Sequence, residues 1–329
     1  MAGVRLVRLG FLAALCGIVL AGPAGANDST AAFAAGGLVL TETDAIGLVH
    51  EELYVSRAEV RVRYVFRNAT DADVETLVAF PLPDIDISYY SEVPIEAPTD
   101  EPDNFVGFTV KADGVAIEPS LHVTATLAGK DVTEILAVYG VPISRFAPDL
   151  YEKLWALPRA DQDALQARGL AYYERDYEGV YPQWTQHAAF TWMQRFPAGQ
   201  DVVVEHAYHP VVGTRFISEY TLTIDEEEDF RDRYCLDGAA VAERLAAAGA
   251  SEGLLLADEV GYVLTTANNW AGPIGRLDLT VDIGVAGNLA ATCAEGLVSE
   301  TPTTLVGSFR DVEPTRDLWV LVIRRDPES

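Results

Sequence analysis

The regular alternation of large apolar and polar residues is the feature that most restricts how this chain can fold. Between residues 184 and 196 the large aromatic side chains all fall on even positions, and after a turn at 197–200 a second alternating stretch runs over 201–212. Residues 58–66 alternate in the same way. Successive side chains of a strand point to opposite faces, so a period of two indicates half-buried strands. We therefore expect a mainly β protein built from antiparallel hairpins, with the aromatic face in the core; stacking on sugars is the alternative.

A change of period divides the chain into segments. Residues 27–128 are predicted to form an N-terminal β-sandwich, and residues 179–329 a second sandwich-like antiparallel β region. Between them, in residues 129–178, leucines recur at helical spacing. We expect a helical insertion that covers one sheet face, with a lid or docking arm as the alternative.

The first 26 residues have the composition of a secretory signal peptide. Arg5 and Arg8 precede an apolar run over residues 9–20, and the small residues Ala24 and Ala26 fit the cleavage rule. The run is short for a membrane span, and no later segment is long and apolar enough to be one. We therefore expect cleavage after Ala26 and a periplasmic or secreted protein without a transmembrane segment; an uncleaved anchor is the alternative.

The charge balance disfavours one class of partner. The chain has 50 acidic and 23 basic residues, which gives a formal net charge of −27. Proteins that follow the phosphates of nucleic acids need clustered Lys and Arg, so no nucleic-acid partner is expected. We interpret the acidity as a solvated surface, with cation binding as the alternative.

Two cysteines remain after the predicted cleavage, Cys235 and Cys293, because Cys16 lies in the signal segment. In an oxidising compartment an even pair of cysteines is most simply a disulfide. A redox or metal pair is the alternative, but neither a CxxC spacing nor a nearby histidine supports it. We therefore expect a structural disulfide.

The motifs favour no catalytic, metal or cofactor site. Residues 249–253 match the pattern GxSxG, but a predicted helix precedes Ser251 and a strand-like run follows it, which reverses the order of a nucleophile elbow. His206 and His209 are three apart on a predicted strand and would face opposite sides, so they are not expected to share a metal. The acidic run 225–229 lacks the spacing of a calcium loop. We expect no cofactor, and an enzyme is disfavoured.

Tyrosines that follow the helical insertion form the candidate binding surface, and they are Tyr172, Tyr173, Tyr177 and Tyr181. Clustered tyrosines are typical of recognition surfaces. The alternative is that they fix the insertion to the sheet. The insertion itself, from Tyr151 to Leu170, is the other candidate surface.

Several blocks of the sequence together resemble a known bacterial family. They are Asn27-Asp28-Ser29 with Gly36-Gly37-Leu38, residues 64–83 ending in Phe-Pro-Leu-Pro, residues 192–197 with 206–210, and residues 269–274. These blocks resemble the domain-of-unknown-function family 4424, and the resemblance covers essentially the whole mature chain. It implies export and no established activity. The order of strand, Asn turn, strand and Phe-Pro-Leu-Pro also resembles the vault and inter-alpha-trypsin inhibitor heavy-chain domain, which implies a β-sandwich of larger extracellular assemblies.

We therefore expect a non-catalytic binding or assembly module of the cell envelope, with an envelope protein as its partner. The alternative is an envelope hydrolase that uses carboxylates or a metal in a cleft between the two β regions. Carboxylates or His206 converging in a deep pocket would favour the hydrolase, and a flat aromatic patch would favour binding.

Overall fold

The structure is a computed structural model that describes residues 27–34, 37–88, 95, 97–174, 179–224, 227–248 and 255–324. The predicted signal peptide (1–26), Tyr177, residues 225–226 of the acidic run and the GxSxG segment 249–253 lie outside the described residues.

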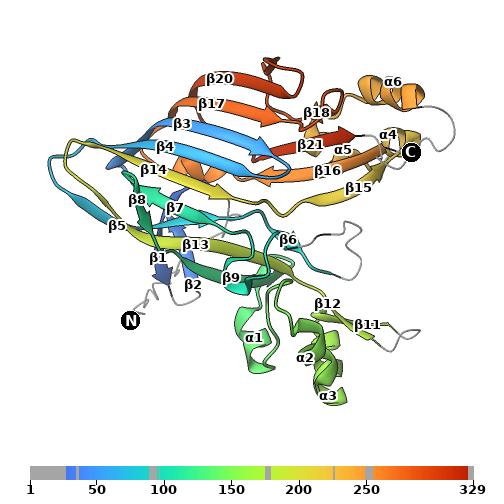
Figure 1. Cartoon of the computed structure of the whole chain (residues 1–329). Helices are drawn as coiled ribbons and strands as arrows, with labels where there is room; N and C mark the ends of the chain where they lie inside the picture. The colour runs from blue at the N-terminus through green and yellow to red at the C-terminus, as the bar shows by residue number, and fades with distance from the viewer. Residues whose placement is uncertain are drawn as a thin grey trace, which may run out of the picture.

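Two large sheets form the body of the protein (Figure 1). The first sheet has the order β10 (Lys130–Asp131), β9 (Ser120–Leu127), β13 (Thr185–Phe196), β5 (Val74–Pro81), β1 (Ser29–Ala34) and β2 (Gly37–Thr41), and β6 (Ile85–Asp86) also pairs with β13. The second sheet has the order β19 (Val298–Ser299), β20 (Thr304–Val312), β17 (Ile274–Asp282), β3 (Ile46–Ser56), β4 (Val60–Asn68), β14 (Asp201–Tyr208), β7 (Thr109–Ala112) and β8 (Val115–Ile117).

The main core lies between these two sheets and is rich in aromatic rings. Phe108, just before β7, stacks on Phe80 of β5 and Phe190 of β13, with ring centroids 5.0 and 4.5 Å away. The aromatic face of residues 184–196 is therefore buried, as its period predicts. The mainly β class and the antiparallel pairing are confirmed, although β17 and β3 pair in parallel.

Each of the two large sheets contains strands from both predicted β segments, 27–128 and 179–329. In the first sheet β13, from segment 179–329, lies between β5 and β9 of segment 27–128. In the second sheet β14 lies between β4 and β7. β13 and β14 are consecutive in the chain but belong to different sheets, so the turn between them crosses from one sheet to the other and the expected hairpin of 184–212 is not formed. The apolar faces of the two strands complete the core between the sheets.

The helical insertion is a minor part of the fold and projects from the first sheet, in the lower part of Figure 1. It contains α1 (Thr133–Val138), α2 (Leu150–Ala156), α3 (Arg159–Ala167) and β11 (Ala171–Glu174), which forms a hairpin with β12 (Gly179–Pro182) just after the insertion. Leu136, Leu150, Leu154 and Leu165 are buried in a second core together with Trp184, which anchors the insertion to the sheet. The helical spacing of the leucines is thereby explained.

A third sheet lies beside the second, on the right of Figure 1, with the order β15 (Gly213–Ile217), β16 (Leu255–Tyr262), β21 (Leu318–Arg324) and β18 (Leu289–Ala291). The helices α4 (Glu219–Thr223), α5 (Glu228–Tyr234) and α6 (Gly238–Ala248) accompany it, and the 3-10 turns are Pro102–Asn104 and Thr265–Asn269. Within the described ranges, no helix is long and apolar enough to span a bilayer.

Candidate functional site

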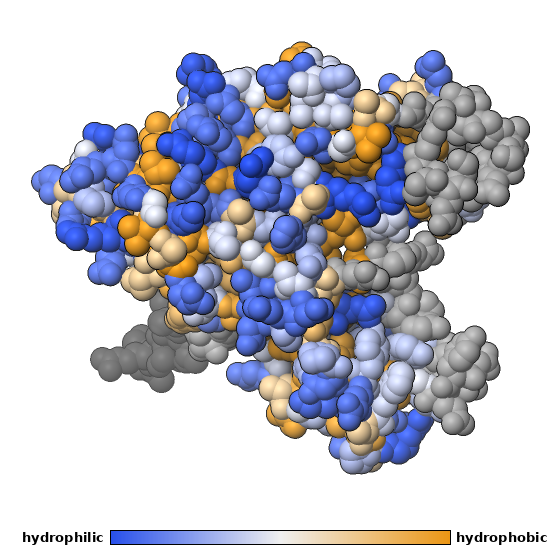
Figure 2. All heavy atoms as spheres, in the orientation of Figure 1, coloured by the Kyte–Doolittle hydropathy of each residue, from blue (hydrophilic) through white to orange (hydrophobic). Residues whose placement is uncertain are grey.

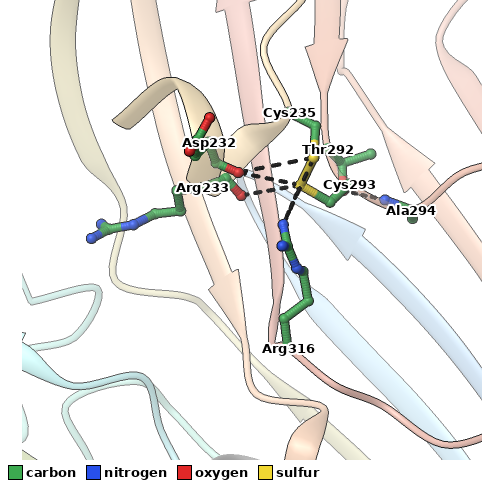
Figure 3. Close-up of a disulfide and its surroundings, with 7 residues drawn as sticks. All are labelled: Asp232, Arg233, Cys235, Thr292, Cys293, Ala294 and Arg316. Carbon is green, nitrogen blue, oxygen red and sulfur yellow. Dashed lines mark hydrogen bonds between the residues drawn. A yellow bond between two sulfur atoms is a disulfide. The ribbon is translucent and has the colours of Figure 1, made fainter. Parts of the chain in front are cut away.

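Cys235 and Cys293 form a disulfide in the structure (Figure 3). It joins the end of α5 to the loop after β18, and the two cysteines are 58 residues apart in the sequence. The Arg316 guanidinium lies against it, with Nη1 2.9 Å from Sγ of Cys293. The bond ties α5 to the third sheet, which is a structural role.

The described tyrosines of the candidate surface belong to the β11–β12 hairpin and contact the insertion. The Arg159 guanidinium lies over the Tyr173 ring, 4.4 Å from its centroid. The Tyr181 ring packs 6.3 Å from Tyr151 and 6.4 Å from Trp155. Tyr172 pairs with Tyr181 across the hairpin. All three are half-buried. Tyr173 and Tyr181 hold the hairpin against the helices, and all three present part of their surface to solvent.

His206 and His209 have separate surroundings. The side chain of His206 is 0% exposed and lies in the main core, where its Nε2 is 3.0 Å from Oδ1 of Asp28. His209 Nδ1 instead lies 2.8 Å from the main-chain oxygen of Ala58. His209 lies one residue beyond the end of β14, and the two imidazoles contact different partners.

Five buried polar residues meet in the main core, and we call them the polar core cluster: Asp28, Glu51, Tyr64, His206 and Tyr262. The Tyr262 hydroxyl donates to Oε1 of Glu51 at 2.9 Å and lies 2.7 Å from the Tyr64 hydroxyl. Burial raises the pKa of Asp28 and raises the pKa of Glu51 to about 7. Aromatic rings enclose His206, so the cluster has the side chains of an acid–base site without access for a substrate.

The segment after the predicted cleavage site holds this cluster in place. The main-chain nitrogen of Asn27 donates to Oγ1 of Thr266 at 2.6 Å, and Asn27 Nδ2 donates to Oε2 of Glu51 at 3.1 Å. The indole nitrogen of Trp270 donates to the main-chain oxygen of Asp28. Asn27 and Asp28 are completely buried, which their sequence does not indicate, because polar residues at a chain end are usually exposed.

A cleft of about 420 Å³ lies between the β5–β6 segment, the end of β14 and the third sheet. Its apolar wall includes Leu82, Phe105 and Trp319. Gly261 makes room for the Trp319 ring, because a Cβ at this glycine would lie 2.8 Å from it. The volume is in the range of small-molecule sites.

Tyr208 and Glu259 are among the residues that line the cleft. The Tyr208 hydroxyl and Oε1 of Glu259 are buried and have no hydrogen-bond partner among the described residues. The other carboxylate oxygen of Glu259 accepts a hydrogen bond of 2.7 Å from the Tyr234 hydroxyl. This bond fixes the carboxylate, because Tyr234 is itself fully buried.

The charged residues of the cleft are mostly acidic. Asp84, Asp86, Glu259 and Asp317 line it together with Arg233. Oδ1 of Asp317 accepts three hydrogen bonds from Leu264 and Thr265, so this oxygen is already satisfied within the protein. The arrangement favours a ligand with a positive charge.

A hydroxyl, an imidazole and a carboxylate are aligned beside the cleft. Thr126 Oγ1 lies 2.8 Å from Nε2 of His187, and Nδ1 of the same ring lies 2.5 Å from Oδ1 of Asp84. The order resembles that of a catalytic triad. Thr126, however, pairs with both β10 and β13, and this engages the main chain around it in the sheet.

A family model described as a domain of unknown function, DUF4424, matches residues 26–321. The chain belongs to this family. No curated protein matches it. Among solved structures, it is similar to a Legionella pneumophila protein named "putative nutrient binding protein", with 14% identity, a TM-score of 0.46 and coverage of 91% of this chain and 70% of that chain. A similarity of this size supports no conclusion about function.

The DUF4424 match includes the polar core cluster, the cleft and both cysteines. The resemblance in the sequence predicts the family correctly, but no motif predicts the cleft. Its residues come from segments between Leu82 and Trp319 that meet only in the folded chain. The nearest signal in the sequence is Trp319, which lies in the short apolar run 318–323, and a run of this length indicates only a strand.

Proposed function

We propose that this chain is an exported, non-catalytic binding module of the cell envelope that holds a small ligand in the cleft. The Tyr208 hydroxyl and Oε1 of Glu259 carry the proposal, because they are buried and lack hydrogen-bond partners among the described residues. Buried polar groups are nearly always hydrogen-bonded, and an unpaired one costs about 1–3 kcal/mol. A ligand that bonds to both groups recovers this energy.

The lining defines the chemistry of the ligand. Glu259 can only accept hydrogen bonds while it is ionised, and Tyr208 can donate or accept. The remaining wall is largely apolar, with Trp319 and Phe105 as aromatic surfaces. We therefore propose a small organic cation, an apolar or aromatic body that carries a protonated amine. The amine would bind Glu259, and the body would lie against Trp319.

The proposed compartment rests on the sequence and on the disulfide. Residues 1–26 have the features of a signal peptide, and cleavage after Ala26 would leave a more acidic mature chain. The Cys235–Cys293 bond is compatible with an oxidising compartment, where such bonds persist. The periplasm or the exterior of the cell therefore fits the proposal.

The direct experiment is calorimetric titration of the mature protein with a panel of alkyl and aromatic monoamines, each beside its uncharged N-acetyl analogue. We expect at least one amine to bind and its analogue to bind at least about tenfold more weakly, because only the amine pairs with Glu259. Glu259→Gln should remove this preference. Glu75→Gln, an exposed carboxylate on β5, is the matched control.

The insertion supports a second candidate, assembly with an envelope protein. Val138 is 83% exposed and Trp155 is 51% exposed on the projecting helices. On the face shown in Figure 2 the insertion carries hydrophobic residues among hydrophilic ones. Cross-linking in intact cells tests this candidate: a single partner linked through the insertion or through Tyr173 supports it, and the absence of any partner contradicts it.

The aligned Thr126, His187 and Asp84 are the observation that favours the alternative of a hydrolase. Thr126 lies near the end of β9 and is paired on both sides, so the main chain around it is engaged in the sheet and does not offer the grouped amide donors that stabilise an oxyanion in acyl transfer. We therefore expect these residues to organise the sheet surface. Hydrolysis of an aryl acetate that disappears in His187→Ala would overturn the non-catalytic proposal.

A further inference from the structure

Asn27 is completely buried although it directly follows the predicted cleavage site. Its main-chain nitrogen lies 2.6 Å from Oγ1 of Thr266, and Thr266 donates back to the main-chain oxygen of Asn27 at 2.7 Å. The side-chain nitrogen reaches the Glu51 carboxylate, whereas Oδ1 of Asn27 has no hydrogen-bond partner among the described residues. The residue is therefore held by specific contacts from strand β3 and from the 3-10 turn Thr265–Asn269.

The charged groups around Asn27 are unbalanced. Asp28 and Glu51 are buried carboxylates, and His206 is the one imidazole in the polar core cluster. Tyr64 and Tyr262 are kept neutral, since burial and the nearby carboxylates raise their pKa. Buried carboxylates need a cationic partner or many hydrogen bonds to remain ionised. The polar core cluster therefore contains two carboxylates, Asp28 and Glu51, but only one imidazole, His206, that could balance their charge.

We propose that signal-peptide cleavage supplies the missing cation: the new α-ammonium group of Asn27 stays buried and pairs with Glu51 and Asp28. The cleavage is a hydrolysis by a signal peptidase, in which water adds across the peptide bond between Ala26 and Asn27. It leaves a carboxylate on Ala26 and an amine on Asn27 that takes up a proton. Thr266 Oγ1 and the unpartnered Oδ1 of Asn27 are acceptors for its hydrogens.

Processing is then coupled to the final stability of the fold. A chain that keeps Ala26 has a neutral amide at this place, and its buried carboxylates lack the added positive charge. The processed chain gains an ion pair in a medium of low dielectric constant, where it is strong. The inference rests on the proposed export, but it needs no ligand.

The test compares two proteins released from a fusion by a site-specific protease, one beginning at Asn27 and one beginning at Ala26. At neutral pH we expect the melting temperature of the protein that begins at Asn27 to be about 2–4 °C higher than that of the protein that begins at Ala26. Its α-amine should resist acylation in the folded state and react after unfolding. Equal melting temperatures, or an α-amine that reacts equally fast in both states, would overturn the proposal.

The extra Ala26 could lower the melting temperature by crowding the buried chain end as well as by removing the charge. The variant Glu51→Gln distinguishes these two causes, because it removes only the charge that the ammonium group would pair with. We expect the difference in melting temperature to shrink in this background and to persist with Glu52→Gln, a more exposed neighbour on β3. An unchanged difference in Glu51→Gln contradicts the ion pair. Mass spectrometry of the exported protein must also give Asn27 as its first residue; another first residue refutes the inference and leaves the cleft proposal intact.

Discussion

The side-chain nitrogen of Asn27 lies 3.1 Å from Oε2 of Glu51, and both residues are completely buried between the two large sheets. The start of the predicted mature chain is therefore part of the core. Its contacts join segments that are distant in the sequence, since Thr266 of the 3-10 turn and Trp270 after it hold the same segment. The stability of the fold should depend on the charges of this cluster.

The first prediction concerns pH in the form that keeps Ala26. The Glu51 carboxyl has its ordinary pKa near 4.5 when unfolded and a pKa of about 7 when folded. Between these values the folded state binds more protons, so the free energy of unfolding should fall by up to about 3 kcal/mol as the pH rises from 4.5 to 7. Urea unfolding across this range measures the slope. Glu51→Gln should flatten it, and an unchanged slope would contradict the role of Glu51.

A second prediction concerns the disulfide. Replacing Cys235 and Cys293 together by serine should lower the free energy of unfolding by about 4 kcal/mol, because the bond closes a loop of 58 residues in the unfolded chain. Chemical denaturation of the oxidised protein and the double variant measures this loss. If the variant and the parent unfold at the same urea concentration, the bond has no structural role.

A third prediction concerns the stacked rings of the core. Phe108→Ala should destabilise the protein by about 3–5 kcal/mol, because Phe108 fills the space between Phe80 and Phe190. Phe216, which is 60% exposed on β15, is the matched control, and Phe216→Ala should cost less than about 1 kcal/mol. Similar losses in both variants would contradict the assignment of the main core.

The fourth prediction concerns Tyr208→Phe, which should weaken ligand binding without lowering the stability of the free protein. The hydroxyl is buried without a hydrogen-bond partner among the described residues, so its removal should leave the free protein equally stable or up to about 1 kcal/mol more stable. The same change should weaken ligand binding about tenfold. Thermal unfolding and calorimetry measure the two effects. A marked loss of stability would show that the hydroxyl already has a stabilising contact.

The fold class could be predicted because the apolar period of residues such as Phe190 and Trp192 is a local property of the sequence. The pairing of β13 with β5 and β9 could not, because nothing local specifies which distant strand completes a sheet. The insertion could be predicted from its leucines, whereas the tyrosines as a binding surface stay a prediction. Their contacts with Arg159 and Trp155 depend on tertiary packing.

The buried site residues were the hardest to predict. Glu259 and Tyr208 look like ordinary strand residues in the sequence, and only the folded chain shows that Oε1 and the hydroxyl lack hydrogen-bond partners among the described residues. Asp28 belongs to one of the blocks that resemble the family, but nothing in the sequence indicates that it pairs with His206 in the core.

Calorimetric titration of the mature protein with the monoamine panel, repeated for Glu259→Gln, tests the central proposal most directly. The account predicts that an aromatic or alkyl amine binds in a one-to-one complex and that Glu259→Gln weakens it at least about tenfold. Absence of binding by every amine of the panel, or equal affinity in the variant, would contradict the cleft as a site for small organic cations.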